Sequence, residues 1–67
     1  MNLSILIPLL NEEESLNELY NWIIKVMQSH NYSYEIIFLD DGSTDNSWTI
    51  IEGFAQENPN VKGVRFM

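Results

Sequence analysis

Hydrophobic residues in this sequence form short continuous runs that are separated by a stretch with helical spacing. Residues 3–8 and 34–39 are the two apolar runs, and runs of this length are typical of strands buried in a parallel sheet. The stretch between them predicts a helix, capped by Asn11 and with acids in its first turn, where the helix dipole favours them. Its core-facing stripe is predicted to be Leu16, Leu19, Tyr20, Ile23 and Met27.

The second half of the chain continues the alternation of strand and helix. Residues 30–33 predict a connection, a second helix is expected to begin within residues 43–46, and residues 61–67 predict a third strand. This order indicates an α/β fold with a parallel sheet and right-handed crossovers. If the strands lie in the spatial order three, two, one, both helices cover one face and leave the other bare. Trp22 and Trp48 are expected to be packing residues of the two helices.

The composition narrows the classes of partner. The chain has no cysteine, a single histidine and a net charge of −7, so neither a structural zinc site nor a basic surface for nucleic acid or an anionic membrane is expected. The first apolar run is followed by acids and has no basic segment before it, unlike a signal peptide. No run is long enough to span a bilayer, and a cytoplasmic location is expected.

The length of the chain predicts an incomplete domain. A chain of 67 residues buries only about 60% of the surface that its unfolded form exposes, and here no disulfide is available to stabilise it. Apolar residues on both sides of the predicted strands would leave a hydrophobic patch on the uncovered face. We therefore expect residues 1–67 to be a truncated part of one domain that associates with itself through the uncovered sheet.

Candidate binding residues follow the first two predicted strands. Residues 8–12 form the end of the first strand and the segment after it, and residues 40–43, Asp-Asp-Gly-Ser, come after the second. Adjacent parallel strands would bring these residues to one edge, where open α/β sheets bind their ligands. A carboxylate there can accept a hydrogen bond from the ring N–H of uracil or guanine, whereas adenine offers no equivalent donor.

Two segments of the chain together resemble a known family. Ser4–Pro8 followed by Asn11–Glu13, and Asp40–Ser43 followed by Asp45, are similar to the amino-terminal part of family 2 glycosyltransferases, especially the dolichyl-phosphate mannose and undecaprenyl-phosphate sugar synthases. The resemblance covers nearly all of the chain. It implies the amino-terminal βαβαβ half of a Rossmann-like, GT-A type domain that binds a nucleotide-diphosphate sugar.

The resemblance also implies roles for individual residues. Asp41 would accept a hydrogen bond from the base, Leu39 would pack beside the base, and Asp40 would orient the loop. An aromatic residue is common in the family where Leu10 stands here. The nucleotide-binding residues that the resemblance implies are Pro8, Leu10, Glu12, Leu39 and Asp41.

The implied reaction needs groups that this sequence does not supply. In the family, the Asp-x-Asp metal motif and the catalytic base are expected well beyond Met67, so we expect no catalytic residue and no metal ligand in this chain, which alone would be inactive. The complete domain would use Mg²⁺ or Mn²⁺ and a UDP- or GDP-linked sugar, and its acceptor would be a lipid phosphate or a glycan. The parent protein would then act at the cytoplasmic face of a membrane.

Other interpretations compete for the same residues. Asp40 and Asp41 are also typical of a polar turn, while Asp45 and Glu12 are typical of helix starts. A phosphatase of the haloacid dehalogenase type is a poor alternative because Leu39 would occupy the nucleophile position. A calcium loop is also poor because Gly42 comes too early in it. The main alternative function is a non-catalytic, self-associating α/β fragment.

Overall fold

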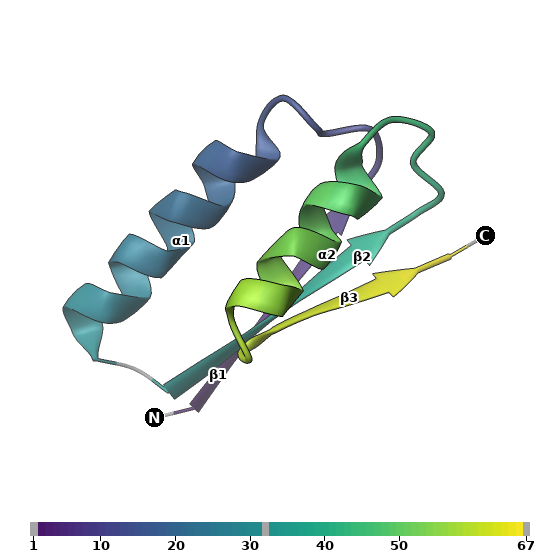
Figure 1. Cartoon of the computed structure of the whole chain (residues 1–67). Coiled ribbons are helices and arrows are strands. Elements are labelled where there is room, and N and C mark those ends of the chain that lie inside the picture. The colour runs from purple at the N-terminus through teal and green to yellow at the C-terminus, as the bar shows by residue number, and fades with distance from the viewer. Residues whose placement is uncertain (1, 32, 67) are drawn as a thin grey trace.

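A computed structural model describes residues 2–31 and 33–66 of the chain. Its elements follow one another along the chain as β1 (Asn2–Leu9), α1 (Leu16–His30), β2 (Ser33–Asp40), α2 (Ser47–Glu57) and β3 (Val61–Arg65). The strands are parallel and lie in the spatial order β1-β2-β3 (Figure 1). The predicted α/β class and βαβαβ order are therefore confirmed. Tyr32 in the predicted connection and Met67 in the predicted third strand lie outside the described residues.

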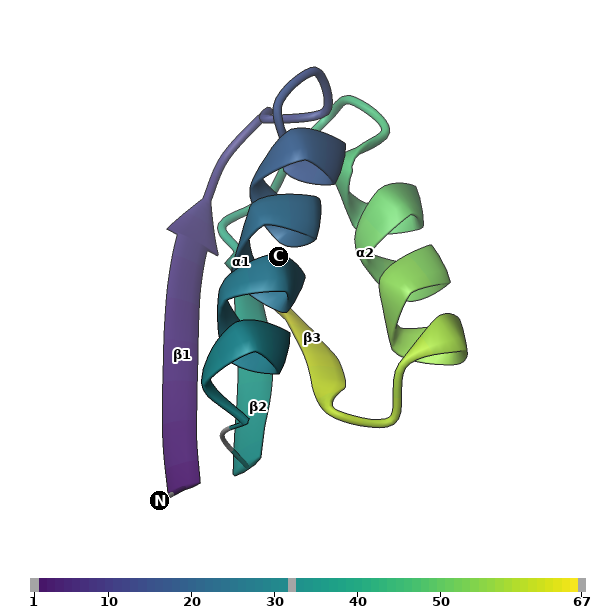
Figure 2. The same cartoon turned by 90° about the vertical axis from the view of Figure 1, so that its left-hand side faces the viewer.

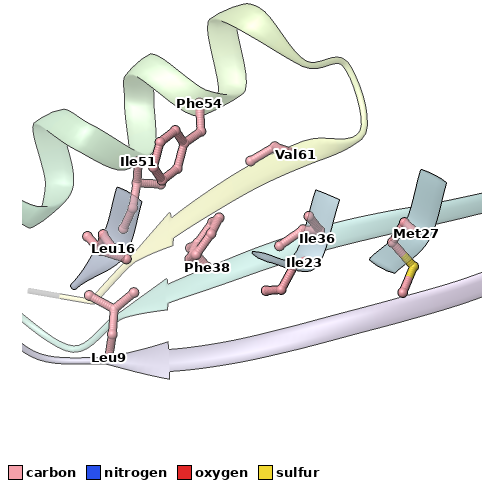
Figure 3. Packing of buried hydrophobic residues seen from close by; sticks show 9 residues of the cluster. All are labelled: Leu9, Leu16, Ile23, Met27, Ile36, Phe38, Ile51, Phe54 and Val61. Carbon is pink, nitrogen blue, oxygen red and sulfur yellow. The ribbon is translucent and has the colours of Figure 1, made fainter. Parts of the chain in front are cut away.

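Both helices pack on the same face of the sheet (Figures 1 and 2). The hydrophobic core lies between the helices and that face (Figure 3), and it consists of Leu9, Leu16, Ile23, Met27, Ile36, Phe38, Ile51, Phe54 and Val61. Neither of the two described helices covers the opposite face, where Leu6 is 61% exposed and Val64 is 41% exposed. The structure thus confirms the predicted bare face. In the order β1-β2-β3, β1 is an edge strand, and the helices cover one of its two faces.

Pro8 lies on this edge strand without breaking the ladder between β1 and β2. The backbone N–H of Asp41 donates to the carbonyl of Leu9 at 3.0 Å, so Leu9 directs its backbone groups toward β2. Since alternate residues of a parallel strand face the same neighbour, Pro8 directs its backbone nitrogen away from β2. Proline has no N–H to donate, and this outward position is one where the sheet loses no hydrogen bond.

Helix α1 begins at Leu16 and not directly after Asn11, so the predicted N-cap was wrong. Residues 12–15 form a turn in which the carbonyl of Glu12 accepts the N–H groups of Ser15 and Leu16, both at 3.1 Å. Asn11 itself has a φ of 52°, in the left-handed region, whereas the N-cap residue of the helix, Ser15, has a φ of −106°. At its other end the helix runs through His30, beyond the predicted boundary, and stops at Asn31 with a φ of 58°.

Helix α2 packs closely on β3 because Gly63 carries no side chain. A Cβ atom at Gly63 would lie 2.7 Å from Cγ2 of Ile51 and 3.0 Å from the Trp48 ring. Trp48 is half-buried against the core, in agreement with its predicted packing role. The same prediction for Trp22 was wrong, because Trp22 is 64% exposed at the groove between α1 and β1. Leu19 of the predicted core stripe is likewise exposed.

Candidate functional site

The carboxyl ends of the three strands meet at one edge of the sheet. Leu9 and Asp40 are register partners in the β1–β2 pair, and Asp40 pairs with Arg65 across β2 and β3. Two backbone hydrogen bonds extend the pairing past the strand ends: Asp41 N–H donates to the Leu9 carbonyl at 3.0 Å, and Phe66 N–H donates to the Asp40 carbonyl at 2.8 Å. The prediction that the ends of the first two strands meet at one edge is therefore confirmed.

The two adjacent aspartates at the end of β2 have opposite environments. Asp40 is fully buried on the helix-covered side, and its Oδ1 accepts the Ser43 N–H at 2.8 Å. Asp40 Oδ2 is also buried but has no hydrogen-bond partner among the described residues. Asp41 is exposed to solvent. Of the two carboxylates, Asp41 is the one that a ligand at the strand ends can reach.

Pro8 and Leu39 are neighbours on the bare face of the sheet, close to the strand end that Asp41 follows. The two residues are register partners, and the alternation along each strand turns both side chains away from the helices. Leu10, which is 51% exposed, follows β1 beside Asp41. Four of the five residues suggested by the sequence, namely Pro8, Leu10, Leu39 and Asp41, therefore lie around the end of the β1–β2 pair.

Glu12, the fifth suggested residue, lies apart from this group. Its Oε2 accepts the Ser15 hydroxyl at 2.9 Å, and it lines a hollow of about 290 Å³ together with Asn11, Glu13, Glu14 and Asp45. A larger apolar groove, of about 370 Å³, runs between β1 and α1. Of the suggested residues, Pro8 lies on that groove.

Side chains tie the β1–α1 loop to the β2–α2 loop, which lie side by side in both views (Figures 1 and 2). The Asn11 N–H donates to Ser43 Oγ at 2.9 Å, and the Glu12 N–H donates to Ser47 Oγ at 2.9 Å. In return, Asn11 Oδ1 accepts the N–H groups of Thr44 at 2.9 Å and Asp45 at 3.3 Å. These contacts were not predicted from the sequence. The signal for them was an asparagine, a residue that tolerates the left-handed region, two positions after the end of a strand.

Asp45 completes the connection between the loops. Its Oδ1 accepts the Ser47 N–H at 2.9 Å, and its Oδ2 accepts the Glu13 N–H at 3.2 Å. A hydrogen bond from the Ser47 side chain is the main cause that lowers the pKa of Asp45 below its ordinary value, and backbone hydrogen bonds of Ser47, Glu13 and Asp45 itself lower it further. Burial opposes this shift. Asp45 thus lies two residues before α2, where it accepts the N–H of the first residue of the helix, and it also holds the neighbouring loop.

The described part of the chain does not hold a candidate metal centre. Within residues 2–31 and 33–66, no three histidine, cysteine, aspartate or glutamate side chains are grouped so that they could hold a metal ion. The helices of this part are also not long and apolar enough to cross a membrane.

Comparisons with known proteins bear on what this edge binds. A family model described as glycosyl transferase family 2 matches residues 4–66. The chain is 48% identical over 54 residues to the undecaprenyl-phosphate 4-deoxy-4-formamido-L-arabinose transferase of Shewanella sediminis, a match that covers 81% of this chain and 16% of that protein. It is 33% identical over 66 residues to the prophage bactoprenol glucosyl transferase homolog of Escherichia coli, covering 98% of this chain and 22% of that protein. The chain therefore spans about a fifth of the length of such relatives.

Proposed function

The chain belongs to glycosyl transferase family 2, and from this we propose that it holds the nucleoside of a nucleotide-diphosphate sugar. The sugar would be transferred to a lipid phosphate or a glycan by a longer protein of which these residues form a part. The names of the relatives, an undecaprenyl-phosphate sugar transferase and a bactoprenol glucosyl transferase homolog, favour the lipid phosphate. A protein with that acceptor would act at a membrane surface, and we propose its cytoplasmic face.

The exposed carboxylate of Asp41 is the observation that carries the proposal. Its backbone N–H is fixed to Leu9, so the residue has a defined place at the sheet edge. An ionised carboxylate only accepts hydrogen bonds, and the ring N–H of uracil or guanine is a matching donor. Adenine has no such ring donor, so this residue favours UDP- or GDP-linked sugars over ADP-linked ones.

The apolar residues next to Asp41 provide the second part of the proposed site. Leu39 and Pro8 offer a surface on the bare face against which a base can pack, and Leu10 offers an exposed apolar side chain at its rim. Leu10 contributes contact area and not ring stacking, since it is aliphatic. We assign Asp40 the orientation of the loop because its carboxylate binds the Ser43 N–H. Glu12 would shape the outer wall of the pocket.

The chemistry of the transfer requires groups other than those described. A divalent cation, Mg²⁺ or Mn²⁺, would neutralise the leaving diphosphate in the complete domain. Among residues 2–31 and 33–66, no three acids or histidines are placed so that together they could hold such an ion. We therefore propose that the chain by itself binds nucleotide without transferring sugar.

Titration of the 67-residue chain with UDP, GDP and ADP tests this proposal, with the affinities read from chemical-shift changes. We expect UDP or GDP to bind more tightly than ADP, and Asp41→Asn to weaken that binding about 10- to 100-fold, since a hydrogen bond to a charged group contributes about 1.5–3 kcal/mol. Glu52→Gln, an exposed charge change on α2, is the control and should leave the affinity unchanged. Equal affinities for Asp41→Asn and the unmodified chain would refute the role of Asp41.

A second candidate function is self-association of a non-catalytic fragment. It is favoured by the exposure of large apolar residues on and beside the bare face, among them Leu6, Val64 and Phe66. Sedimentation over a range of concentrations tests it. A second copy on this face would give a dimer that Leu6→Lys disrupts, while Asn17→Lys makes the same charge change on the exposed side of α1 and should not. A monomer at every concentration would refute it.

A further inference from the structure

The hydrogen bonds between the two loops follow a reciprocal pattern. Three consecutive N–H groups of the β1–α1 loop donate to side chains of the β2–α2 loop and of the first residue of α2: Asn11 to Ser43, Glu12 to Ser47 and Glu13 to Asp45. Two consecutive N–H groups of the β2–α2 loop, those of Thr44 and Asp45, donate to the side chain of Asn11. We call this set of contacts the interloop clamp. Asn11 and Asp45 each both donate and accept in it, and Asn11 takes part in three of its five hydrogen bonds.

The conformation of Asn11 is what allows the reciprocal pattern. Its φ of 52° lies in the left-handed region, which asparagine adopts more readily than most residues. In this conformation its N–H reaches Ser43 at 2.9 Å while its Oδ1 reaches the Thr44 N–H at 2.9 Å. Glycine would keep the backbone conformation but lose the acceptor. Aspartate would keep an acceptor oxygen at the same place.

The clamp lies directly beside the residues proposed to contact the nucleoside. Leu10 precedes Asn11, and Asp41 is separated from the clamp residue Ser43 by a single glycine. The glycine, Gly42, has a φ of 92°, so the chain turns sharply between Asp41 and Ser43. Fixing Asn11 to Ser43 and Thr44 therefore fixes the two ends of the proposed base site relative to each other.

We propose that Asn11 is a positioning residue for nucleotide binding, which acts by holding Leu10 and Asp41 in register through the interloop clamp. This inference rests on the proposed function of the site. Binding is tighter when the contacting groups are held in place before the ligand arrives, because less conformational freedom is lost. A chain without the clamp would keep both contact residues but would have to order them on binding.

The test compares Asn11→Gly, Asn11→Asp and the unmodified chain by two measurements. Amide hydrogen exchange without ligand should be at least about fivefold faster at Thr44 and Asp45 in Asn11→Gly, because both amides lose their acceptor. The affinity for UDP or GDP should fall about fivefold in the same variant. Asn11→Asp should restore both values toward those of the unmodified chain.

Asn31→Gly is the matched control. Asn31 is the other described asparagine with a left-handed backbone, with a φ of 58°, and it lies at the end of α1 away from the strand ends. Its replacement should leave exchange at Thr44 and Asp45 and the nucleotide affinity unchanged. A change as large as that in Asn11→Gly would overturn the proposal, because the effect would then follow from glycine alone.

The two measurements separate failure of this inference from failure of the proposed function. Unchanged exchange at Thr44 and Asp45 in Asn11→Gly would overturn the clamp whatever the nucleotide does. Faster exchange with unchanged affinity would overturn the positioning role. No binding of UDP or GDP to the unmodified chain, together with faster exchange in the variant, would overturn the proposed function and the role toward nucleotide but not the clamp itself.

Discussion

Replacement of Gly63 by alanine tests the closest contact between α2 and the sheet. The added Cβ atom would lie 2.7 Å from Ile51 Cγ2 and 3.0 and 3.1 Å from two atoms of the Trp48 ring. Ile51 is fully buried, so it cannot move away without disturbing the core. Overpacking of this kind costs about 1–3 kcal/mol. A chain of 67 residues has a total stability of roughly 3–10 kcal/mol, so the loss is a large fraction of it.

Urea unfolding of both glycine variants, followed by circular dichroism, measures this cost. Gly53→Ala is the control, because no atom lies within 4 Å of a Cβ added at this exposed position inside α2. It should stabilise the chain by about 0.5–1 kcal/mol through its higher helix propensity. In an Ile51→Ala background, which lacks the contacting Cγ2 atom, Gly63→Ala should lower the free energy of unfolding by less than it does in the unmodified chain. The reasoning is refuted if Gly63→Ala unfolds at the same urea concentration as the unmodified chain.

Two further predictions concern the acids of the β2–α2 loop. Asp40→Ala should lower the free energy of unfolding by about 1–3 kcal/mol because the Ser43 N–H loses its acceptor. Asp40→Asn keeps an acceptor oxygen, so it should lower the free energy of unfolding by less than Asp40→Ala in the same urea experiment. An equal loss in both variants would show that the charge is required. Because the pKa of Asp45 is lowered on folding, its contribution to stability is complete above its ordinary value of 3.8 and is lost as the pH falls through the lowered pKa. The difference in unfolding free energy between Asp45→Asn and the unmodified chain should therefore shrink on acidification below pH 3.8, and a constant difference would contradict this.

The element order could be predicted from the sequence because it depends on local periodicity. The apolar runs at residues 3–8 and 34–39 lie within β1 and β2, and the helical stripe of α1 includes the buried residues Leu16, Ile23 and Met27. A three-stranded parallel sheet whose order follows the chain then leaves one face without helices. The prediction of the bare face thus followed from topology and not from any single residue.

The start of α1 could not be predicted because Asn11 forms long-range contacts. Asparagine before three glutamates has the composition of a helix N-terminus, and local propensity favours a cap there. In the structure the Asn11 side chain binds N–H groups of Thr44 and Asp45, which are more than thirty positions away. The predicted packing role of Trp22 was wrong for a different reason. Trp22 lies within a helix, but its side chain is exposed beside the edge strand β1.

The opposite environments of Asp40 and Asp41 follow from the alternation of side chains along a strand. Because successive side chains of a strand point to opposite faces, the Asp40 carboxylate points toward the core and the Asp41 carboxylate points toward solvent. Sequence position alone identifies the pair as binding candidates, but the placement of helices on one face decides which of the two is accessible. Because both helices cover the side of Asp40, only Asp41 can meet a ligand without a rearrangement of α2 and the loop before it.

The interloop clamp also bears on which part of a nucleotide this edge can hold. Loops at the carboxyl ends of parallel strands often bind phosphate through free backbone N–H groups near a helix start. Here the N–H groups of residues 11–13 and of residues 44 and 45 already donate to side chains of the facing loop. A phosphate could use these donors only by displacing Asn11, Asp45 or the serines, which would leave buried hydroxyl groups without partners. The neighbouring carboxylates would also repel it. The described loops are therefore better suited to position a base against Asp41 than to bind the diphosphate.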